Sequence, residues 1–366
     1  MTQPESTYPL LALCARAQGH PIQYHQLRQQ ATTLTDWPGL PALAESHGLT
    51  PLLYTHLQAA GVSVPAEVLH QLQARALQHS HANRVRAQAL AELLAAFQAA
   101  GIESLVLKGA ALAHLVYPQP GLRPMRDVDV LVSRAQVRQA QGLLAELGFA
   151  APLPGQTLPA KHLLTAQRRD EGLPVSVELH HNLYTEGTAA TTLEALRPRA
   201  VPVSLGGVTA STLGYEDMLD HVYQHSRIIF DPLRLISIAD LVSLAERFAA
   251  EIDWPRVSPR VRNALALCHW LSPLSEELLQ TAALNPGRPP AGIGQEFQGW
   301  PRYPLAAQRD KGYVALLRDS FYPSEWWLRF YYAPASPLAF WWSRVVAHPL
   351  HILGWVGHYF RHRVRN

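Results

Sequence analysis

Apolar residues recur at helical spacing through most of the first hundred residues of this chain. The longest run covers residues 64–100, and Gly101 follows it, which is a residue type typical of helix ends. No alternating strand pattern occurs in this part of the sequence. The pattern therefore predicts an N-terminal helical region over residues 1–101.

Strand-like and helix-like segments alternate in the next hundred residues. The predicted strands are 104–107, 127–132 and 174–180, with a further β-segment around 201–208, and the predicted helices are 109–117 and 134–147, the second capped by Ser133. Short strands that alternate with helices indicate an α/β core, which we place at residues 102–210.

The remainder of the chain is predicted to be helical again, with one interruption. Residues 211–284 have helical patterns, and 285–304 are rich in proline and glycine, as expected of a linker. An aromatic, basic C-terminal region follows, and we group it with the linker as 285–366. The predicted fold class is α+β, with a small mixed β-sheet core embedded in a mostly helical protein.

Composition favours a globular enzyme in a reducing compartment. The chain has 366 residues, of which 48% are hydrophobic and 16% charged, enough to bury a large core in two or more domains. Its two cysteines, Cys14 and Cys268, have no metal-ligand or disulfide spacing. The N-terminus lacks the basic segment of a secretory signal. We expect a cytoplasmic protein.

Positive charge is concentrated in the C-terminal region. Residues 326–366 contain five arginines, five tryptophans and no acidic residue, whereas the rest of the chain has a net charge of −2. An acidic body disfavours extended nucleic-acid binding. For 326–366, packing against the helical region is the main expectation, and the alternatives are peripheral contact with the inner face of a membrane and contact with a partner protein.

Two carboxylates, Asp127 and Asp129, are the leading candidates for chemistry. Side chains two residues apart on a strand point the same way and lie about 7 Å apart along the backbone. Two such carboxylates can share a pair of divalent ions, Mg²⁺ or Mn²⁺. This arrangement suits phosphoryl chemistry.

A Lys-Gly turn precedes this pair in the sequence. Lys108 and Gly109 follow a short apolar strand and begin a predicted helix, whose first N–H groups form an anion site. Lysine is rare in the chain, at Lys108, Lys161 and Lys311 only. A lysine in this turn indicates a phosphate contact.

The order of these segments resembles a known family. A strand, Lys108-Gly109, a helix, Tyr117-Pro118 and then Arg126-Asp127-Val128-Asp129 on a second strand is similar to the bacterial family called uncharacterised nucleotidyltransferases, in the DNA polymerase β-like nucleotidyltransferase superfamily. Residues 175–184 and the helical stretch 215–246, with its Arg-x-x-x-x-x-Asp pattern, extend the resemblance over roughly 36–246.

The resemblance implies a nucleotidyltransferase core and a set of functional residues. Asp127, Asp129 and Glu178 would bind magnesium, and Lys108, the Gly109 amide, Arg126 and Arg123 would contact the triphosphate of an NTP. Asp170 and Glu171 are less favoured alternatives to Glu178 because they lie in a polar loop. The implied activity is transfer of a nucleotide to a hydroxyl-bearing acceptor, which is a small molecule or a protein.

Several alternatives remain open at this stage. His180 and His181 follow Glu178 and could border the site or be structural. His221 and His225 have zinc-compatible spacing but no third ligand, so a packing or substrate-pocket role is favoured. The protein could also be an inactive scaffold of a biosynthetic system, or a toxin-like modifier of RNA or protein. Adjacent carboxylates that repel without a cation argue against the scaffold.

Overall fold

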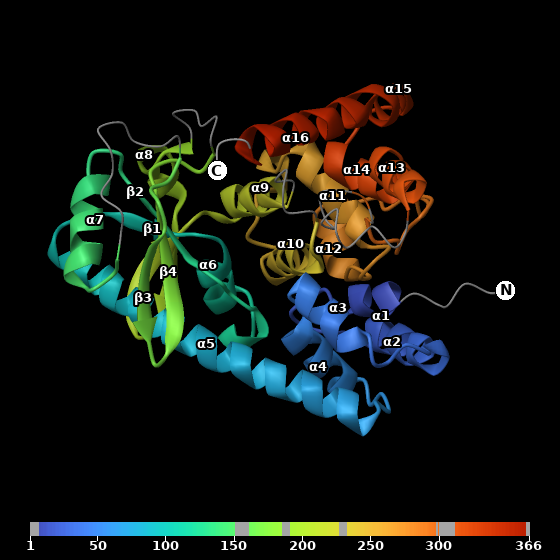
Figure 1. Cartoon of the computed structure of the whole chain (residues 1–366), viewed down its shortest axis with the longest axis horizontal. Coiled ribbons are helices and arrows are strands. Elements are labelled where there is room, and N and C mark those ends of the chain that lie inside the picture. Colours follow the sequence, from blue (N-terminus) through green and yellow to red (C-terminus); the bar gives the residue numbers. More distant parts are fainter. Residues whose placement is uncertain are drawn as a thin grey trace.

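The computed structural model describes residues 7–150, 161–184, 191–226, 233–297, 299 and 312–363, with side chains described to residue 357. It confirms the predicted α+β class: a six-stranded mixed sheet lies at one side of a mostly helical molecule (Figure 1). The predicted segments that fall on 1–6, 151–160, 185–190, 227–232, 298, 300–311 and 364–366 lie outside the described residues.

The N-terminal region is helical, as predicted. It consists of α1 (Thr7–Leu13), α2 (Pro21–Thr33), α3 (Leu40–His47), α4 (Thr50–Ala59) and α5 (Ala66–Ala99). Helix α5 ends just before Gly101, which has a positive φ of 68° that glycine adopts without strain. Figure 1 shows α5 crossing the whole molecule, from the small N-terminal helices to the sheet. Helix α5 thus connects the helical region to the α/β core.

The sheet has the strand order β3-β4-β2-β1-β6-β5. Its strands are β1 (Ser104–Val106), β2 (Val128–Val132), β3 (Ala166–Asp170), β4 (Leu173–His180), β5 (Val201–Leu205) and β6 (Val208–Thr212). Strands β2 and β4 pair in parallel, as do β1 and β6, and the other neighbours are antiparallel. The predicted strands at 104–107, 127–132 and 174–180 correspond to β1, β2 and β4.

The sequence patterns missed one strand and merged two others. Strand β3 forms a hairpin with β4, and the single β-segment predicted at 201–208 is a second hairpin of β5 and β6. Both turns have positive φ at two residues, Glu171-Gly172 and Gly206-Gly207, as two-residue hairpin turns require. Strand β3 reads AQRRD, and its polar edge residues conceal the pattern of a half-buried strand.

The two faces of the sheet contact different parts of the molecule. Val130 and Val132 of β2 point into a core shared with the C-terminal half of α5 and with α7 (Val137–Glu146). Leu131, of opposite parity, belongs to the larger core of the helical regions. Asp129 has the same parity as Leu131, so its side chain lies on the face of the sheet toward that larger helical part.

The structure also defines the first and last residues of the other helices of the core and of the region that follows it. They are α6 (Lys108–Leu115), α8 (Leu193–Leu196), α9 (Tyr215–His225), α10 (Leu235–Arg247), α11 (Pro259–Cys268) and α12 (Glu276–Thr281). Helix α7 begins later than the predicted 134. Ser133 accepts a hydrogen bond from the Gln136 amide and closes a turn that precedes the helix. Residues 285–297 form neither helix nor strand, as expected of a linker.

The C-terminal region folds against the helical part of the protein. It contains α13 (Tyr313–Phe321), α14 (Glu325–Tyr332), α15 (Pro337–Trp342), a π-helical segment at Ser343–Ala347 and α16 (His348–Arg363). Trp326, Trp327 and Phe330 of α14 are buried in the large core, and the Tyr223 hydroxyl of α9 donates to the Phe330 carbonyl over 2.8 Å.

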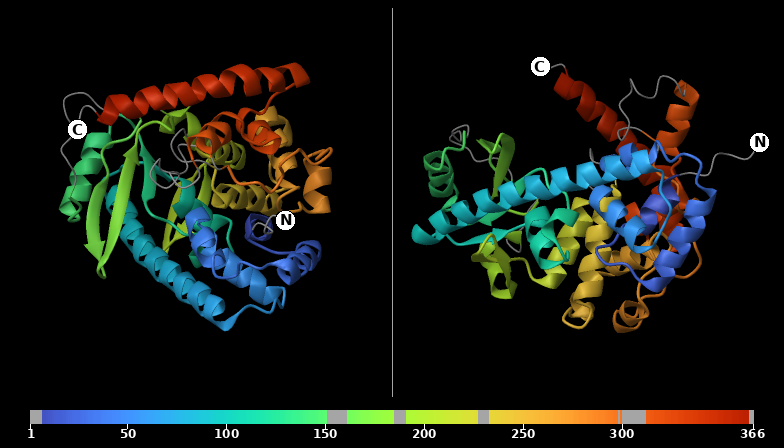
Figure 2. Two further views of the ribbon diagram at one scale, coloured as in Figure 1. Left: turned by 45° about the vertical axis from the view of Figure 1, so that its right-hand side comes forward. Right: turned by 90° about the horizontal axis from the view of Figure 1, so that it is seen from below.

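Among the described helices, none is long and apolar enough to cross a bilayer. Figure 2 shows α15 and α16 as a rod along the outer edge of the molecule.

Candidate functional site

Two neighbouring parallel strands bring acidic side chains together at the centre of the sheet. In the register of β2 and β4, Asp129 lies directly opposite Glu178, and Leu131 lies opposite His180. Glu178 and His180 share the parity of Asp129, so all three side chains are on one face of the sheet. Asp127 lies one residue before β2 begins. The structure therefore places Asp127, Asp129 and Glu178 near one another.

The loop before β2 is held in place by α5. Asn83, buried in the middle of α5, donates from its amide to the carbonyls of Pro120 and Arg123, each over 2.8 Å. Its side-chain oxygen accepts from the Met125 amide over 3.3 Å. These hydrogen bonds fix the loop that leads into Arg126 and Asp127. The rigid middle of α5 thus positions the entrance to the candidate site.

Lys108 and His180 both contact the Asp129 carboxylate. Lys108 Nζ lies 2.6 Å from Asp129 Oδ1, and His180 Nε2 lies 2.7 Å from the same oxygen. Lys108 has a φ of 47°, a left-handed conformation that costs a non-glycine residue energy. The strained turn aims the lysine at the carboxylate. The Asp129 carboxylate therefore contacts both a lysine ammonium and a histidine ring.

These contacts determine the protonation of the acidic cluster. Burial opposes ionisation of Asp129, but the charges and hydrogen bonds of Lys108 and His180 outweigh it and hold the pKa of Asp129 well below its usual value. The pKa of Asp127 is raised by burial and then by the negative charge of Asp129. The pKa of Glu178 is lowered, mainly by His180, whose Nε2 lies 3.7 Å from Glu178 Oε2. Asp129 and Glu178 are thus carboxylates at neutral pH.

One group of side chains among the described residues has the spacing of a metal site. Ligand atoms of Asp129, Glu178 and His180 all lie within 4.8 Å of one another. Carboxylate oxygens suit Mg²⁺ or Mn²⁺. Asp127 is outside this group, although the negative charges of Asp129 and Glu178 both raise its pKa. His180, which the sequence left open between a site role and a structural role, lies within the cluster.

Arg123 and Gly109 pack against each other beside the cluster. Arg123 forms a two-pronged pair with Asp240 of α10, with contacts of 3.1 Å and 2.7 Å, and Asp240 also accepts a 2.7 Å hydrogen bond from the Tyr117 hydroxyl. A Cβ at Gly109 would lie 2.2 Å from Arg123 Nη1. Glycine is needed here because the guanidinium lies directly against the turn. The geometry assigns Arg123 a contact with Asp240, whereas the sequence assigned it to a triphosphate.

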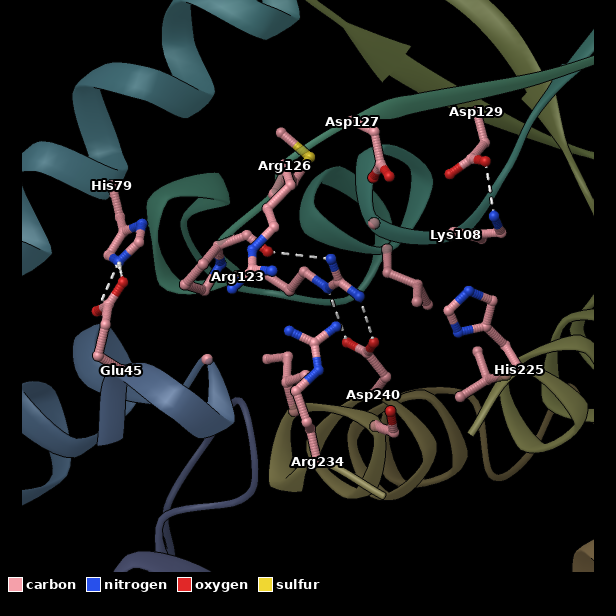
Figure 3. A pocket seen from close by; sticks show the side chains of 18 residues that line it. Glu45, His79, Lys108, Arg123, Arg126, Asp127, Asp129, His225, Arg234 and Asp240 are labelled. Atoms are coloured by element: carbon pink, nitrogen blue, oxygen red, sulfur yellow. Dashed lines mark hydrogen bonds and ion pairs between the residues drawn. The ribbon is translucent and has the colours of Figure 1, made fainter. Parts of the chain in front are cut away.

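A cavity of about 290 Å³ opens beside the acidic cluster, between the sheet and the helical regions (Figure 3). Lys108, Gly109, Arg126, Asp127 and Asp129 line its core side. The helical regions contribute Glu45 and His79 at one end, and Arg234, His225 and Asp240 on the side of α9 and α10. Figure 3 shows Arg126 and Arg234 pointing into this space. One pocket therefore brings together Asp127, Asp129 and the predicted cations with residues from segments far away in the sequence, whereas Glu178 lies outside its lining.

Several pocket residues were not predicted from the sequence. Glu45 and His79 pair across 3.0 Å at the edge of the cavity, and the pKa of Glu45 falls to about 2, mainly through the hydrogen bond from His79. His225, for which the sequence favoured a packing or substrate-pocket role, lines the cavity. The pKa of His225 falls to about 3 because the ring is buried, so this side chain is neutral. Arg234 and Asp240 form the Arg-x-x-x-x-x-Asp pattern, which was recognised in the sequence but was assigned no function there.

Two further cations lie close to the acidic cluster. Arg86 of α5 is near enough to Asp127 for the carboxylate to raise its pKa, although burial lowers it by more. Burial lowers the pKa of Lys161, and the charges of Glu178 and Asp129 oppose that change. No local sequence pattern marks either residue.

Asp170 and Glu171, the alternatives to Glu178, lie at the far end of the β3–β4 hairpin. Asp170 pairs with Arg168 over 2.8 Å, and Glu171 pairs with Arg84 over 2.7 Å. Glu178 is seven residues or more along the chain from both, on the strand that faces Asp129. The hairpin geometry therefore separates these two acids from the cluster.

Comparison with known proteins gives one match. A family model described as an uncharacterised nucleotidyltransferase matches residues 33–271, about two thirds of the chain. The matched segment includes the whole sheet and the pocket, and it ends before the C-terminal helices α13–α16. No curated protein and no solved structure matches this sequence.

Proposed function

Because the chain belongs to the uncharacterised nucleotidyltransferase family, we propose that it transfers a nucleotide from an NTP to a hydroxyl group of a small-molecule or protein acceptor. The observation that carries this proposal is the facing register of Asp129 and Glu178 on β2 and β4. Asp127 lies near this pair, just ahead of β2, and both Asp127 and Asp129 line a pocket that also presents Lys108 and Arg126.

The donor set fits a divalent cation. Asp129 and Glu178 offer hard oxygen ligands beside His180, and Asp127 adds a third carboxylate nearby. Mg²⁺ or Mn²⁺ held by the three carboxylates would neutralise phosphate charge and lower the pKa of the acceptor hydroxyl. Without a cation the charge of Asp129 raises the pKa of Asp127, a repulsion that a bound ion would relieve.

Lys108 and Arg126 would hold the triphosphate. Lys108 reaches Asp129 from the strained turn at the start of α6, and the same side chain lines the cavity. An incoming triphosphate with its cation would offer this ammonium a second anionic partner. Arg126 is exposed at the pocket wall and provides a forked donor for phosphate oxygens. Little covalent chemistry is required of the protein, since positioning and charge stabilisation provide the catalysis.

The acceptor would enter from the side of α9 and α10. His225, Val222 and Ile236 line this side of the cavity opposite Asp127 and Asp129. Glu178 is ionised and lies opposite Asp129 on the neighbouring strand, and in this proposal it would take the proton that leaves the acceptor hydroxyl. This pocket side, built from helices of the family-matched region, would select the acceptor.

One observation favours a second candidate, a nucleotidyltransferase-fold scaffold without activity. Asp129 already has an ion-pair partner in Lys108 and a hydrogen-bond partner in His180, so its carboxylate has partners without a metal ion. A scaffold of a biosynthetic system would retain this network and bind no nucleotide. The two candidates therefore differ in whether a nucleotide is bound and transferred.

Mass spectrometry of products tests the proposal. A metabolite extract and a proteome are each incubated with the protein, MgCl₂ and isotopically labelled ATP, GTP, CTP or UTP. The proposal predicts release of pyrophosphate and a new species whose mass has increased by one nucleoside monophosphate less one water, formed by the native protein and absent with Asp129→Asn. Glu171→Gln, which changes an acid outside the cluster, is the matched control and should form the same product. Absence of any labelled product with all four nucleotides would support the scaffold.

A further inference from the structure

The rod formed by α15, the π segment Ser343–Ala347 and α16 has one side that no other described element covers. It extends along the outer edge of the molecule (Figures 1 and 2) and lies beyond residues 33–271, the segment matched by the family. Its other side packs on the helical part of the protein. The rod is thus an addition to the nucleotidyltransferase region with a surface of its own.

The residue spacing along the rod separates two faces. The buried face consists of Ser343, His348, Ile352 and Trp355, and the exposed apolar face consists of Leu338, Trp341, Trp342, Val345, Leu350 and Leu353. On each face the step across the π segment is five residues, from 343 to 348 and from 345 to 350, and the other steps follow helical spacing. A π turn accommodates one additional residue. The π segment therefore keeps both faces continuous over two helices.

The exposed face is strongly apolar for a surface. Its six side chains have exposed fractions from 49% to 76%, and two of them are tryptophans. Isolated exposed apolar residues are ordinary, but an aligned stripe of them indicates an interaction surface. Tryptophan combines an apolar body with a polar N–H, which suits the boundary between water and lipid. The stripe has the chemistry of a surface that enters such a boundary.

The charge of residues 326–366 indicates which kind of surface binds to this face. Residues 326–366 contain no acidic side chain, and Arg344 is exposed beside Val345 on the rod. Arg361, Arg363 and Arg365 add positive charge to the sequence of its C-terminal end. A second copy of this chain docked through the same face would bring the exposed Arg344 of both copies to one interface, which is unfavourable. An anionic surface complements them.

We propose that the α15–α16 rod lies in the plane of an anionic lipid bilayer, with the apolar stripe among the acyl chains and the arginines at the phosphate headgroups. No described helix can span a membrane, so the contact is peripheral. The contact would hold the nucleotidyltransferase region at the membrane surface. It does not depend on the proposed transfer activity.

Liposome flotation of the full chain tests this proposal. The vesicles contain either phosphatidylcholine alone or phosphatidylcholine with about one third phosphatidylglycerol, in 0.1 M and in 1 M NaCl. The protein should float with the anionic vesicles at low salt and much less at high salt, because the Debye length falls from about 10 Å to about 3 Å. Arg344→Gln should weaken partitioning roughly fivefold at low salt.

Substitutions in the stripe distinguish membrane binding through this face from nonspecific adsorption through exposed apolar side chains. Leu338→Gln, Trp341→Gln and Trp342→Gln together should abolish flotation without lowering the melting temperature, since all three side chains are exposed. The matched control changes Leu77 and Leu164, equally exposed residues on α5 and before β3, to glutamine, and it should float as the native chain does. The proposal is overturned if the native chain fails to float with anionic vesicles at low salt, or if the triple variant floats unchanged. It is also overturned if the stripe instead mediates a dimer, seen as a native dimer that the triple variant dissociates.

Discussion

Lys108 donates to Asp129 across 2.6 Å, from a turn whose φ of 47° is unusual for a residue other than glycine. The strained turn holds the lysine between the carboxylate cluster and the open cavity. The ammonium therefore has Asp129 as its partner among the described residues and, in our account, would gain a second partner in the triphosphate. This double role leads to the first prediction.

Lys108→Met should weaken triphosphate binding far more than nucleoside binding. The lost contact is a charge-assisted hydrogen bond to phosphate, so we expect about 1.5–3 kcal/mol, or roughly 10- to 100-fold in Kd, for ATP with Mg²⁺. Adenosine affinity should change little. Isothermal titration calorimetry measures both, with Arg134→Met as an exposed control beyond the far end of β2. Equal losses for adenosine and ATP would indicate a purely structural lysine.

Gly109→Ala should destabilise the protein because the new Cβ would lie 2.2 Å from Arg123 Nη1. Displacement of a paired guanidinium is comparable to overpacking a core, which costs about 1–3 kcal/mol. Gly142→Ala in α7 is the matched control, since open space surrounds that glycine and alanine favours a helix by about 1 kcal/mol. Thermal melting should show opposite shifts for the two variants. A neutral Gly109→Ala would mean that Arg123 moves freely.

Asp240→Asn should destabilise the fold by about 3–5 kcal/mol, because it leaves the Arg123 guanidinium without its buried anion. Both side chains are mostly buried, at 16% and 5% exposure. Urea denaturation gives the change in free energy of unfolding. Arg197→Ala breaks an exposed pair with Glu103 and should cost under about 1 kcal/mol. A loss at Asp240 no larger than at Arg197 would contradict the structural role of the buried pair.

Stability should decrease as pH falls from about 6.5 to about 4. His56 and His348 are buried, and burial lowers the pKa of each ring from 6.5 to about 4. The unfolded chain binds protons in this interval while the folded rings remain neutral, so stability is complete above pH 6.5 and declines to a plateau below pH 4. Each ring accounts for a loss on the order of 3 kcal/mol.

Melting curves of His56→Gln test this pH dependence. Glutamine retains an N–H donor for the Arg16 carbonyl, which His56 Nε2 contacts at 2.8 Å, but it does not titrate. The variant should lose less melting temperature than the native chain between pH 7 and pH 5. His70→Gln, at an exposed position on α5, should follow the native curve. Parallel curves for His56→Gln and the native chain would exclude a contribution from His56.

The local patterns of the sequence were sufficient for most elements and for the carboxylates. Helix α5 follows its apolar spacing, and Asp129 and Glu178 belong to strands that their own neighbours predict. Strand β3 was missed because its residues are mostly polar and its pairing depends on a hairpin turn at positive φ. Local periodicity does not encode such turns.

The partners of the pocket residues required the folded chain. Arg123 and Asp240 are 117 residues apart, and Lys108 and Asp129 are 21 apart. Each pairing depends on helix packing and on backbone angles that no short window specifies. For this reason the sequence could identify Arg123 as a cation near the site, but it could not predict that Arg123 pairs with Asp240.

Manganese binding tests the central claim, that Asp129 and Glu178 hold a divalent ion together, most directly. Electron paramagnetic resonance measures free Mn²⁺ in a titration of the protein with a non-hydrolysable NTP analogue. The account predicts that Asp129→Asn and Glu178→Gln each weaken Mn²⁺ binding by at least roughly tenfold, whereas Asp170→Asn, on the hairpin outside the cluster, leaves it unchanged. Equal Mn²⁺ affinity in the native chain and in both cluster variants would contradict the account.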